Sequence, residues 1–264
     1  MATNPDPADL RALLDWQREM GADEAIGDRP VDRFALPERM PPAAGAASPA
    51  QPKAAAPPTL LPPESDPITA AEHAAGGAAD LSALKAALED YPHCALRQGA
   101  KQVVFSDGNP RARVMLIGEA PGRNEDALGK PFVGQAGQLL DRMLAAVGMA
   151  RDHEDPARSL YITNVLPWRP PGNRDPEPAE VAMMVPFLRR HVELADPEVL
   201  VLMGNHSCTA ILGKKGITKL RGQWTEGWGR KVLPMLHTAY LLRRPHEKRN
   251  AWADMLSLAD RLGV

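Results

Sequence analysis

Four short apolar runs separated by helix-like segments are the feature that most restricts the fold of this chain. The runs are RVMLIG (113–118), LYITNV (160–165), VLVLMG (199–204) and KVLPMLH (231–237). The segments with helical apolar spacing are AGQLLDRMLAAVG (136–148), EVAMMVPFLRRHVEL (180–194), NHSCTAILG (205–213) and AWADMLSLADRL (251–262). Fully apolar strands that alternate with helices predict an α/β three-layer sandwich with a central, mainly parallel four-stranded sheet flanked by helices.

The chain divides into three predicted parts. Residues 1–36 form an appendage, in which residues 7–26 place several leucines near one face of a helix. Residues 37–67 are so rich in Pro and Ala that we expect a disordered linker. Residues 68–264 form the α/β domain, which begins with a helix near 80–90. The N-terminal helix either docks on its own domain or recruits a protein partner that the sequence does not identify.

Charge and cysteine usage restrict the partners. Residues 1–90 hold 7 Lys or Arg and 15 Asp or Glu, which gives a net charge of −8. Residues 91–264 hold 24 Lys or Arg and 18 Asp or Glu, which gives a net charge of +6. The predicted domain is therefore basic. No apolar run approaches the roughly 18 residues of a membrane span, and the N-terminus lacks the features of a signal peptide, so we expect a cytoplasmic protein without a membrane partner. We also expect a monomer. Cys94 and Cys208 form no CxxC pair.

Polar residues follow three of the predicted strands. Gly118 and Glu119 end the first strand, Asn164 ends the second and His237 ends the fourth. Because ligands of such sheets bind at the carboxyl ends of the strands, these residues predict a site at one edge. Each has a structural alternative, since a strand-end His is often a satisfied structural residue and an Asn often forms a turn or cap. The glycine turn here is a poor phosphate cradle, because Glu119 and Glu125 would repel phosphate.

Five stretches resemble the uracil-DNA glycosylase superfamily in order and spacing. They are GEAPGRNED, GKPFVGQAGQLL, YITNVLPWRPPGNRDP, ITKLRGQW and LHTAYLLRR, and the likeness runs from about residue 91 to 256. The closest branch is family 4, whose bacterial and archaeal members carry an iron–sulfur cluster. The resemblance implies a glycosylase-like sandwich and a base-excision-repair enzyme acting on uracil-containing DNA. Such an enzyme flips the base out of the DNA and hydrolyses its N-glycosidic bond, leaving an abasic site.

The resemblance assigns base recognition to four residues. Phe132 would stack on the flipped base. Asn164 would donate a hydrogen bond to uracil O4 and accept one from N3–H, a pattern that cytosine inverts. His237 would donate to O2 as negative charge collects there. Gly118 belongs to the same base-binding set.

The resemblance assigns catalysis and DNA contact to further residues. Besides His237, the catalytic set that positions water or stabilises the sugar cation is Glu119, Glu125 and Asn173, taken jointly. Some superfamily members carry an aspartate one residue after the Glu119 position, where this chain has Ala120. The residues that would hold the DNA backbone or fill the gap left by the flipped base are Lys219, Arg221, Leu241, Leu242, Arg243 and Arg244.

The chain departs from family 4 at the cluster ligands. The four cysteine positions read Tyr91, Cys94, Trp168 and Met184. Because a cluster of this kind needs about four thiolates, we expect no iron–sulfur cluster, no metal and no other cofactor. The large replacements could fill the cluster's volume with packed apolar surface. Trp168 could instead stack on DNA.

Two replacements in the segment after His237 leave alternatives open. Thr238 stands for the usual proline and Tyr240 for a small residue, which affects the grip on duplex DNA more than the base chemistry. The alternatives are a non-catalytic module that binds uracil or DNA, and a glycosylase for another deaminated base such as hypoxanthine. No histidine-bearing insertion follows Asn164, and no lysine is placed as a Schiff-base nucleophile, so we expect monofunctional turnover without a trapped adduct.

Overall fold

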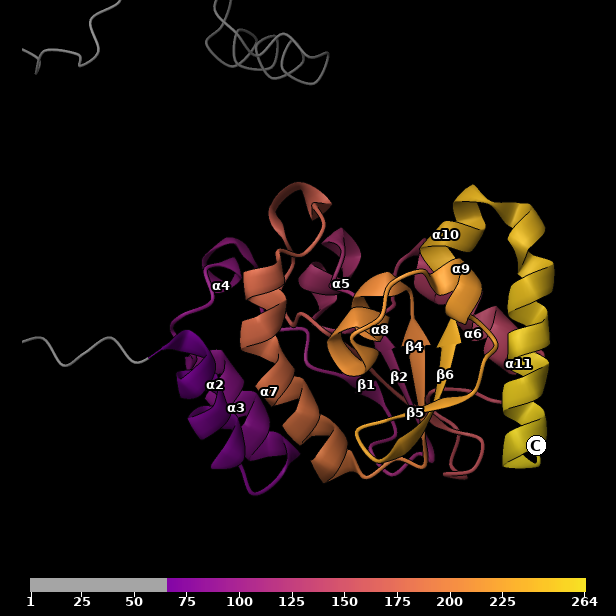
Figure 1. Ribbon diagram of the computed structural model, residues 1–264, viewed down its shortest axis with the longest axis horizontal. Helices are drawn as coiled ribbons and strands as arrows, with labels where there is room; N and C mark the ends of the chain where they lie inside the picture. Colours follow the sequence, from indigo (N-terminus) through magenta and orange to yellow (C-terminus); the bar gives the residue numbers. More distant parts are fainter. Residues whose placement is uncertain (1–65) are drawn as a thin grey trace, which may run out of the picture. The chain divides into compact units, whose positions relative to one another are not determined.

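Residues 66–264 form an α/β sandwich around a six-stranded sheet (Figure 1). The structure is a computed structural model that describes these residues, and the predicted N-terminal helix and most of the predicted linker lie outside them. The strands are β1 (Asp107–Gly108), β2 (Val114–Gly118), β3 (Leu160–Asn164), β4 (Val199–Met203), β5 (Thr225–Gly227) and β6 (Arg230–Met235). Their order across the sheet is β1-β3-β2-β4-β6-β5. The predicted α/β sandwich is confirmed.

The four central strands are the four predicted apolar runs, and they are parallel. β2 pairs with β3 from Val114 opposite Leu160 to Gly118 opposite Asn164. Every residue of β2, β3 and β4 is buried, as expected for strands covered on both faces. The sheet has two more strands than predicted, because β1 and β5 pair antiparallel at its two edges. These edge strands span two and three residues, too few to show a period of two.

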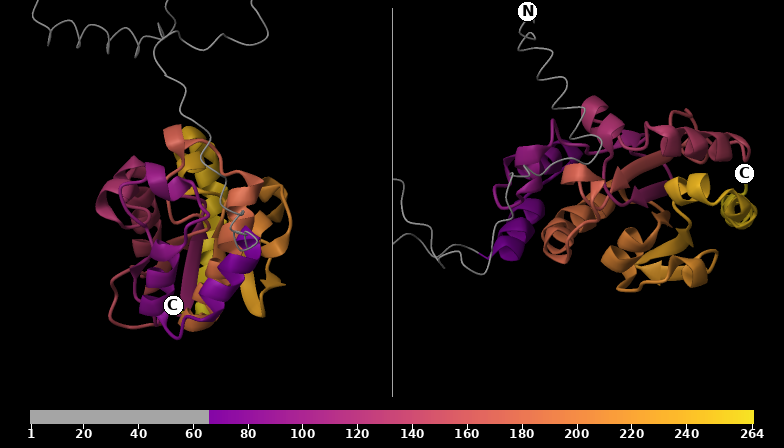
Figure 2. Two further views of the ribbon diagram at one scale, coloured as in Figure 1. Left: turned by 90° about the vertical axis from the view of Figure 1, so that its left-hand side faces the viewer. Right: turned by 90° about the horizontal axis from the view of Figure 1, so that it is seen from above.

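Helices cover both faces of the sheet (Figure 2). One face packs on α7 (Pro178–Ala195) and α8 (Asn205–Leu212), and the other packs on α6 (Gln135–Ala145) and α11 (Lys248–Leu262). The helix pair α2 (Pro67–Gly76) and α3 (Leu81–Asp90) contacts α7. The remaining helical segments are α4 (Leu96–Gly99), α5 (Arg123–Leu128), η1 (Pro171–Asn173), α9 (Ile217–Leu220), α10 (Thr238–Arg243) and η2 (Pro245–Glu247).

The ends of α7 follow from local chemistry. Pro178 occupies the first turn, where a residue without an N–H group leaves no donor unpaired. The Glu180 carboxylate accepts a hydrogen bond from the Glu177 N–H at 2.9 Å, which caps the first turn. The helix ends at Ala195 because Asp196 adopts a left-handed conformation with φ of 50°.

The four positions that correspond to cluster cysteines lie together in one apolar core. Tyr91, Cys94, Trp168 and Met184 are all buried there, together with side chains of α2, α3 and α7. The Tyr91 hydroxyl donates a hydrogen bond to the Pro67 carbonyl at 2.6 Å, which satisfies its polar end. This region is therefore a packed core.

Truncation of Trp168 tests this packing. Trp168 is 2% exposed, so we expect Trp168→Ala to lower the free energy of unfolding by about 3–5 kcal/mol through lost burial and a residual cavity. Trp252 on α11 is 40% exposed and supplies a matched control, for which Trp252→Ala should change stability by about 0.5 kcal/mol or less. Urea unfolding followed by circular dichroism measures both. Equal, small losses for the two variants would contradict the packed core.

Candidate functional site

A pocket of about 340 Å³ lies at the carboxyl ends of the parallel strands. In Figure 1 the arrows of β4 and β6 point toward this edge, where α10 lies. A pocket of this size matches the range of small-molecule sites. The predicted site residues on its wall are Glu119, Glu125, Phe132, Asn164, Asn173, His237 and Arg243.

Gly118 allows two pocket side chains to lie over the end of β2. A Cβ atom at this position would lie 2.3 Å from Asn164 Oδ1 and 2.6 Å from Phe132 Cε2, so any larger residue would displace both. Gly118 therefore shapes the pocket floor by having no side chain.

Phe132 is held by contacts to its backbone. Its φ of 55° is unusual for a non-glycine residue. The Arg151 guanidinium donates a hydrogen bond to the Phe132 carbonyl at 2.9 Å. A Cβ at Gly137 would lie 1.7 Å from the same carbonyl oxygen, so α6 approaches this loop closely only because residue 137 is glycine. Neither Arg151 nor Gly137 was predicted, because these contacts arise between separate turns of the chain.

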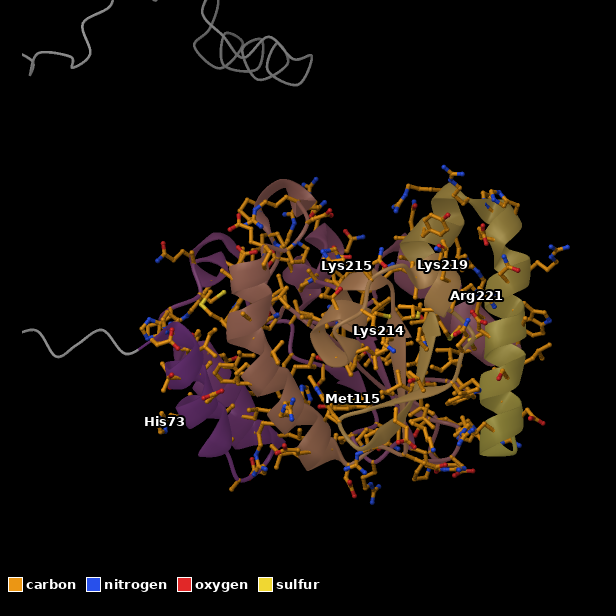
Figure 3. The ribbon with its side chains drawn as sticks, viewed as in Figure 1. His73, Met115, Lys214, Lys215, Lys219 and Arg221 are labelled. Atoms are coloured by element: carbon orange, nitrogen blue, oxygen red, sulfur yellow. The ribbon has the colours of Figure 1, made fainter. Side chains whose placement is uncertain are left out.

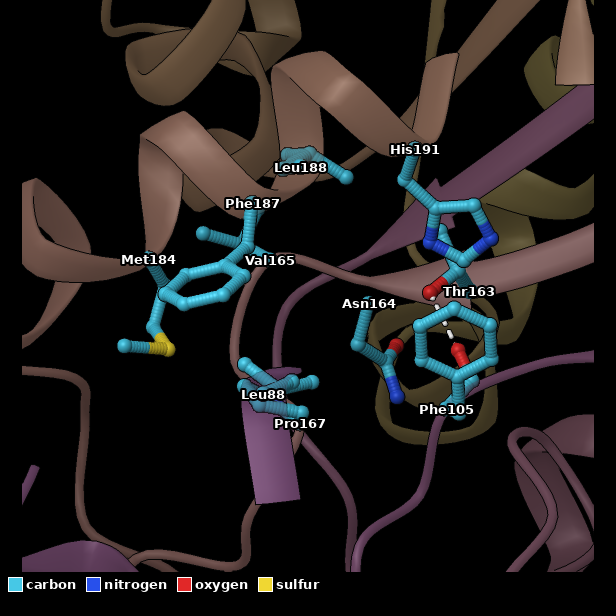
Figure 4. Close-up of a pocket in the computed structure, with 10 residues that line it drawn as sticks. All are labelled: Leu88, Phe105, Thr163, Asn164, Val165, Pro167, Met184, Phe187, Leu188 and His191. Atoms are coloured by element: carbon cyan, nitrogen blue, oxygen red, sulfur yellow. Dashed lines mark hydrogen bonds between the residues drawn. The ribbon is translucent and has the colours of Figure 1, made fainter. Parts of the chain in front are cut away.

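Asn164 presents a free amide on a rigid support. The residue is 6% exposed, and within residues 66–264 its side chain makes no hydrogen bond to protein. Behind it lies a cavity of about 20 Å³, enough for about one water molecule (Figure 4). The neighbouring Thr163 hydroxyl donates to the Phe105 carbonyl at 2.7 Å, which ties the end of β3 to residues 105–106.

A buried histidine completes this support. The His191 ring stacks on Phe105 with centroids 4.3 Å apart, and its Nε2 lies 2.8 Å from the Tyr161 hydroxyl. Burial lowers the pKa of His191 to about 3, so this residue is neutral near pH 7 and supplies structure rather than a proton.

His237 is a neutral hydrogen-bond donor. The Ala239 N–H donates to Nδ1 of His237 at 3.1 Å, which leaves the ring proton on Nε2. Burial lowers the pKa of His237, an effect that Glu119 opposes and Arg243 reinforces. The ring lies 5.3 Å from that of Phe132, at an interplanar angle of 27°. The pocket therefore holds an N–H donor that carries no positive charge.

Glu119 pairs with His206, a histidine outside the predicted site. Its Oε2 lies 2.7 Å from Nδ1 of His206, at the start of α8. Burial opposes ionisation of Glu119, but the hydrogen bond and charge of His206 hold its pKa below the ordinary value. The same hydrogen bond raises the pKa of His206. His206 comes two residues after Gly204, the end of the third predicted strand, so the strand-end rule could have found it.

The Glu125 carboxylate is held by backbone N–H groups of the pocket loop. It accepts hydrogen bonds from the N–H groups of Gly122 at 3.1 Å, Val133 at 2.9 Å and Gly134 at 2.7 Å. These bonds join the two ends of the pocket loop and occupy both oxygens. Glu125 also lines the pocket, and its place in the catalytic set stays a prediction.

The Asn173 side chain lies on the pocket wall and is held through its amide oxygen. Its Oδ1 accepts a hydrogen bond from Arg169 Nε at 2.7 Å. The residue has a φ of 54° and is exposed on the pocket rim. Its oxygen is therefore engaged by Arg169, and its place in the catalytic set stays a prediction.

Two of the predicted DNA contacts are buried or paired instead. Leu241 is fully buried in a core with side chains of α6 and α11, whereas the neighbouring Leu242 is 39% exposed. The Arg221 guanidinium donates to Asp254 at 2.8 Å and to the Asn250 carbonyl at 2.7 Å. Leu241 is therefore too buried to act as the predicted wedge. Arg221 is paired with α11, and its DNA contact stays a prediction.

The other predicted DNA contacts lie on the surface. Leu242, Arg243 and Arg244 are exposed at the end of α10, and Arg243 also reaches the pocket wall. Lys219 is exposed on α9, and Lys214 and Lys215 precede that helix (Figure 3). Within residues 66–264, no group of three or more His, Cys, Asp or Glu side chains could hold a metal ion. No helix of that region has the length and apolar character needed to cross a membrane.

Comparisons with known proteins agree with this geometry. Residues 105–256 match the family model described as the uracil DNA glycosylase superfamily. The type-4 uracil-DNA glycosylase of Thermotoga maritima is 41% identical over 161 residues, covering 59% of this chain and 80% of the relative. Those of Sulfurisphaera tokodaii and Archaeoglobus fulgidus are 38% and 37% identical, each over 64% of this chain and over 79% and 87% of the relatives. The chain therefore belongs to the uracil DNA glycosylase superfamily.

Proposed function

We propose that this protein is a uracil-DNA glycosylase, a repair enzyme that hydrolyses the N-glycosidic bond of uracil in DNA and leaves an abasic site. One observation carries the proposal: the free amide of Asn164 and the Nε2–H donor of His237 share a pocket with the Phe132 ring. An amide can match both O4 and N3–H of uracil, and the neutral imidazole can match O2. The similar type-4 uracil-DNA glycosylases support the same substrate.

The leaving base defines the role of His237. When the bond between C1′ and N1 breaks, its electron pair stays with uracil and negative charge spreads to O2. A preorganised N–H donor in a pocket shielded from water stabilises this charge more than it stabilises the neutral substrate. Because His237 is neutral before the reaction, its donor strength does not depend on a buried positive charge.

Glu119 fits the other half of the reaction. Its negative charge stabilises the sugar cation, and the carboxylate accepts a proton when the water oxygen bonds to C1′. One carboxylate oxygen pairs with His206, and the other remains for water. Glu119 is therefore the acid of the predicted set that we assign to this step, with the Asn173 amide as a second water contact. No lysine of the described chain lines the pocket, which favours a monofunctional enzyme.

We propose that α10 and α9 contact duplex DNA. Leu242 is exposed at the end of α10 and suits a wedge that fills the gap left by the flipped base. The phosphate contacts that we propose are Lys219, Arg243 and Arg244.

The residues at the cluster positions do not fit an iron–sulfur cluster. Cys94 is the one thiol among the four, and burial raises its pKa, which disfavours the thiolate that iron requires. The other three positions hold large side chains, Tyr91, Trp168 and Met184. These side chains are buried in the same apolar core and fill the space that a cluster would need. We propose that the enzyme works without a cluster. The steps assigned to His237 and Glu119 do not involve one.

Replacement of His237 tests the enzyme proposal. We expect His237→Ala to slow uracil release by about 10²–10³-fold, because the uracil anion loses its donor. Labelled single- and double-stranded oligonucleotides with one uracil, treated with alkali after incubation, measure the rate. His73→Ala on α2, a helix that does not line the pocket, is the matched control and should leave it unchanged. A folded wild type that binds uracil-DNA but releases no uracil would favour the binding module.

Iron content tests the proposed absence of a cluster. We expect purified protein to be colourless and to contain no stoichiometric iron, because three of the four ligand positions lack a thiol. Elemental analysis and the visible absorption spectrum of protein purified without oxygen measure this. A brown protein with stoichiometric iron would contradict the proposal.

A further inference from the structure

We propose that His206 is a positioning residue that orients the Glu119 carboxylate for water attack and controls its effective charge. The inference rests on the proposed function, since it concerns the same reaction. The contact that supports it joins Nδ1 of His206 to Oε2 of Glu119 at 2.7 Å. His206 itself does not line the pocket, so it acts through Glu119.

The fold brings the two side chains together from neighbouring strands. Glu119 follows β2, and His206 lies in the first turn of α8, directly after β4. β2 and β4 are adjacent parallel strands, so their carboxyl ends lie at the same edge. Gly204 at this turn has a φ of 98°, and a Cβ there would lie 3.5 Å from the His237 Cβ. The turn therefore sets His206 close to the edge that also carries His237.

The geometry fixes the proton of His206. A carboxylate oxygen only accepts hydrogen bonds, so the Nδ1 atom that faces it carries a proton in both the neutral and the charged form. Neutral His206 thus holds Glu119 by one hydrogen bond and leaves it a full negative charge. Protonated His206 adds a positive charge beside Glu119, which weakens the attraction between Glu119 and the sugar cation and makes Glu119 a weaker base.

Other charges surround the pair. His237 and Arg243 face Glu119 from the segment after β6, and the charged groups that act on His206 besides Glu119 are Asp175 and Lys215. Glu119 is the partner that holds the pKa of His206 above the ordinary value of 6.5, whereas burial and Lys215 oppose this shift. His206 therefore becomes protonated as the pH falls through that raised pKa, and activity should decline over the same range.

Two replacements separate orientation from charge. The amide nitrogen of Asn occupies nearly the place of Nδ1, so His206→Asn keeps a donor to Glu119 but cannot titrate. His206→Leu has similar size and no donor. We expect the Leu variant to lose about 10²-fold in kcat through a misplaced carboxylate, with KM nearly unchanged. We expect the Asn variant to recover most of the wild-type kcat at high pH and to lack the acidic decline that we expect for the wild type.

The experiment measures kcat and KM from pH 5 to 9 for release of uracil from one oligonucleotide, with His73→Asn on α2 as the control. Near-wild-type kcat for the Leu variant, or an unchanged acidic decline in the Asn variant, would overturn the inference. If the Leu variant does not fold, as judged by circular dichroism, the pH profile of the Asn variant decides. A wild type that releases no uracil defeats the proposed function and this inference with it, whereas an active wild type with indifferent variants defeats the inference alone.

Discussion

The parallel hydrogen-bond register of β2, β3, β4 and β6 is the constraint on which the site depends. It sets Gly118 opposite Asn164, so that an amide, a carboxylate and two histidines meet where the strands end. A slip of one residue would turn the Asn164 side chain to the other face of the sheet. The apolar core on both faces prevents such a slip, because it would expose or misplace every buried side chain of the strand.

The two histidines beside Glu119 have pKa values shifted in opposite directions by their surroundings. His237 loses affinity for a second proton through burial, and the Ala239 N–H fixes its remaining proton on Nε2. His206 gains affinity for its proton from direct contact with Glu119. One carboxylate is thus flanked by a neutral donor aimed at the leaving base and by a partner that holds the carboxylate itself. The field of the pocket suits a reaction that separates charge into a sugar cation and a base anion.

The sequence predicted those parts of the structure that depend on local pattern. The four central strands and the polar residues at their ends followed from continuous apolar runs, but β1 and β5 exist only through pairing with β3 and β6. The hydrogen bonds of Glu125 could not be predicted, because two of its three N–H donors, Val133 and Gly134, come from a loop that folds back. The sequence could not indicate which of Leu241 and Leu242 is exposed. Their exposure depends on how the six-residue helix α10 is rotated against α6.

Base release by the wild-type protein tests the central claim most directly, that Asn164 and His237 read uracil. Three oligonucleotides that differ only in one base, uracil, cytosine or hypoxanthine, are incubated with the protein, and the free base is quantified. We predict release of uracil in preference to cytosine, because cytosine's amino group and N3 oppose the amide orientation that pairs with O4 and N3–H of uracil. Comparable release of cytosine or hypoxanthine, or release of no base, would contradict the account.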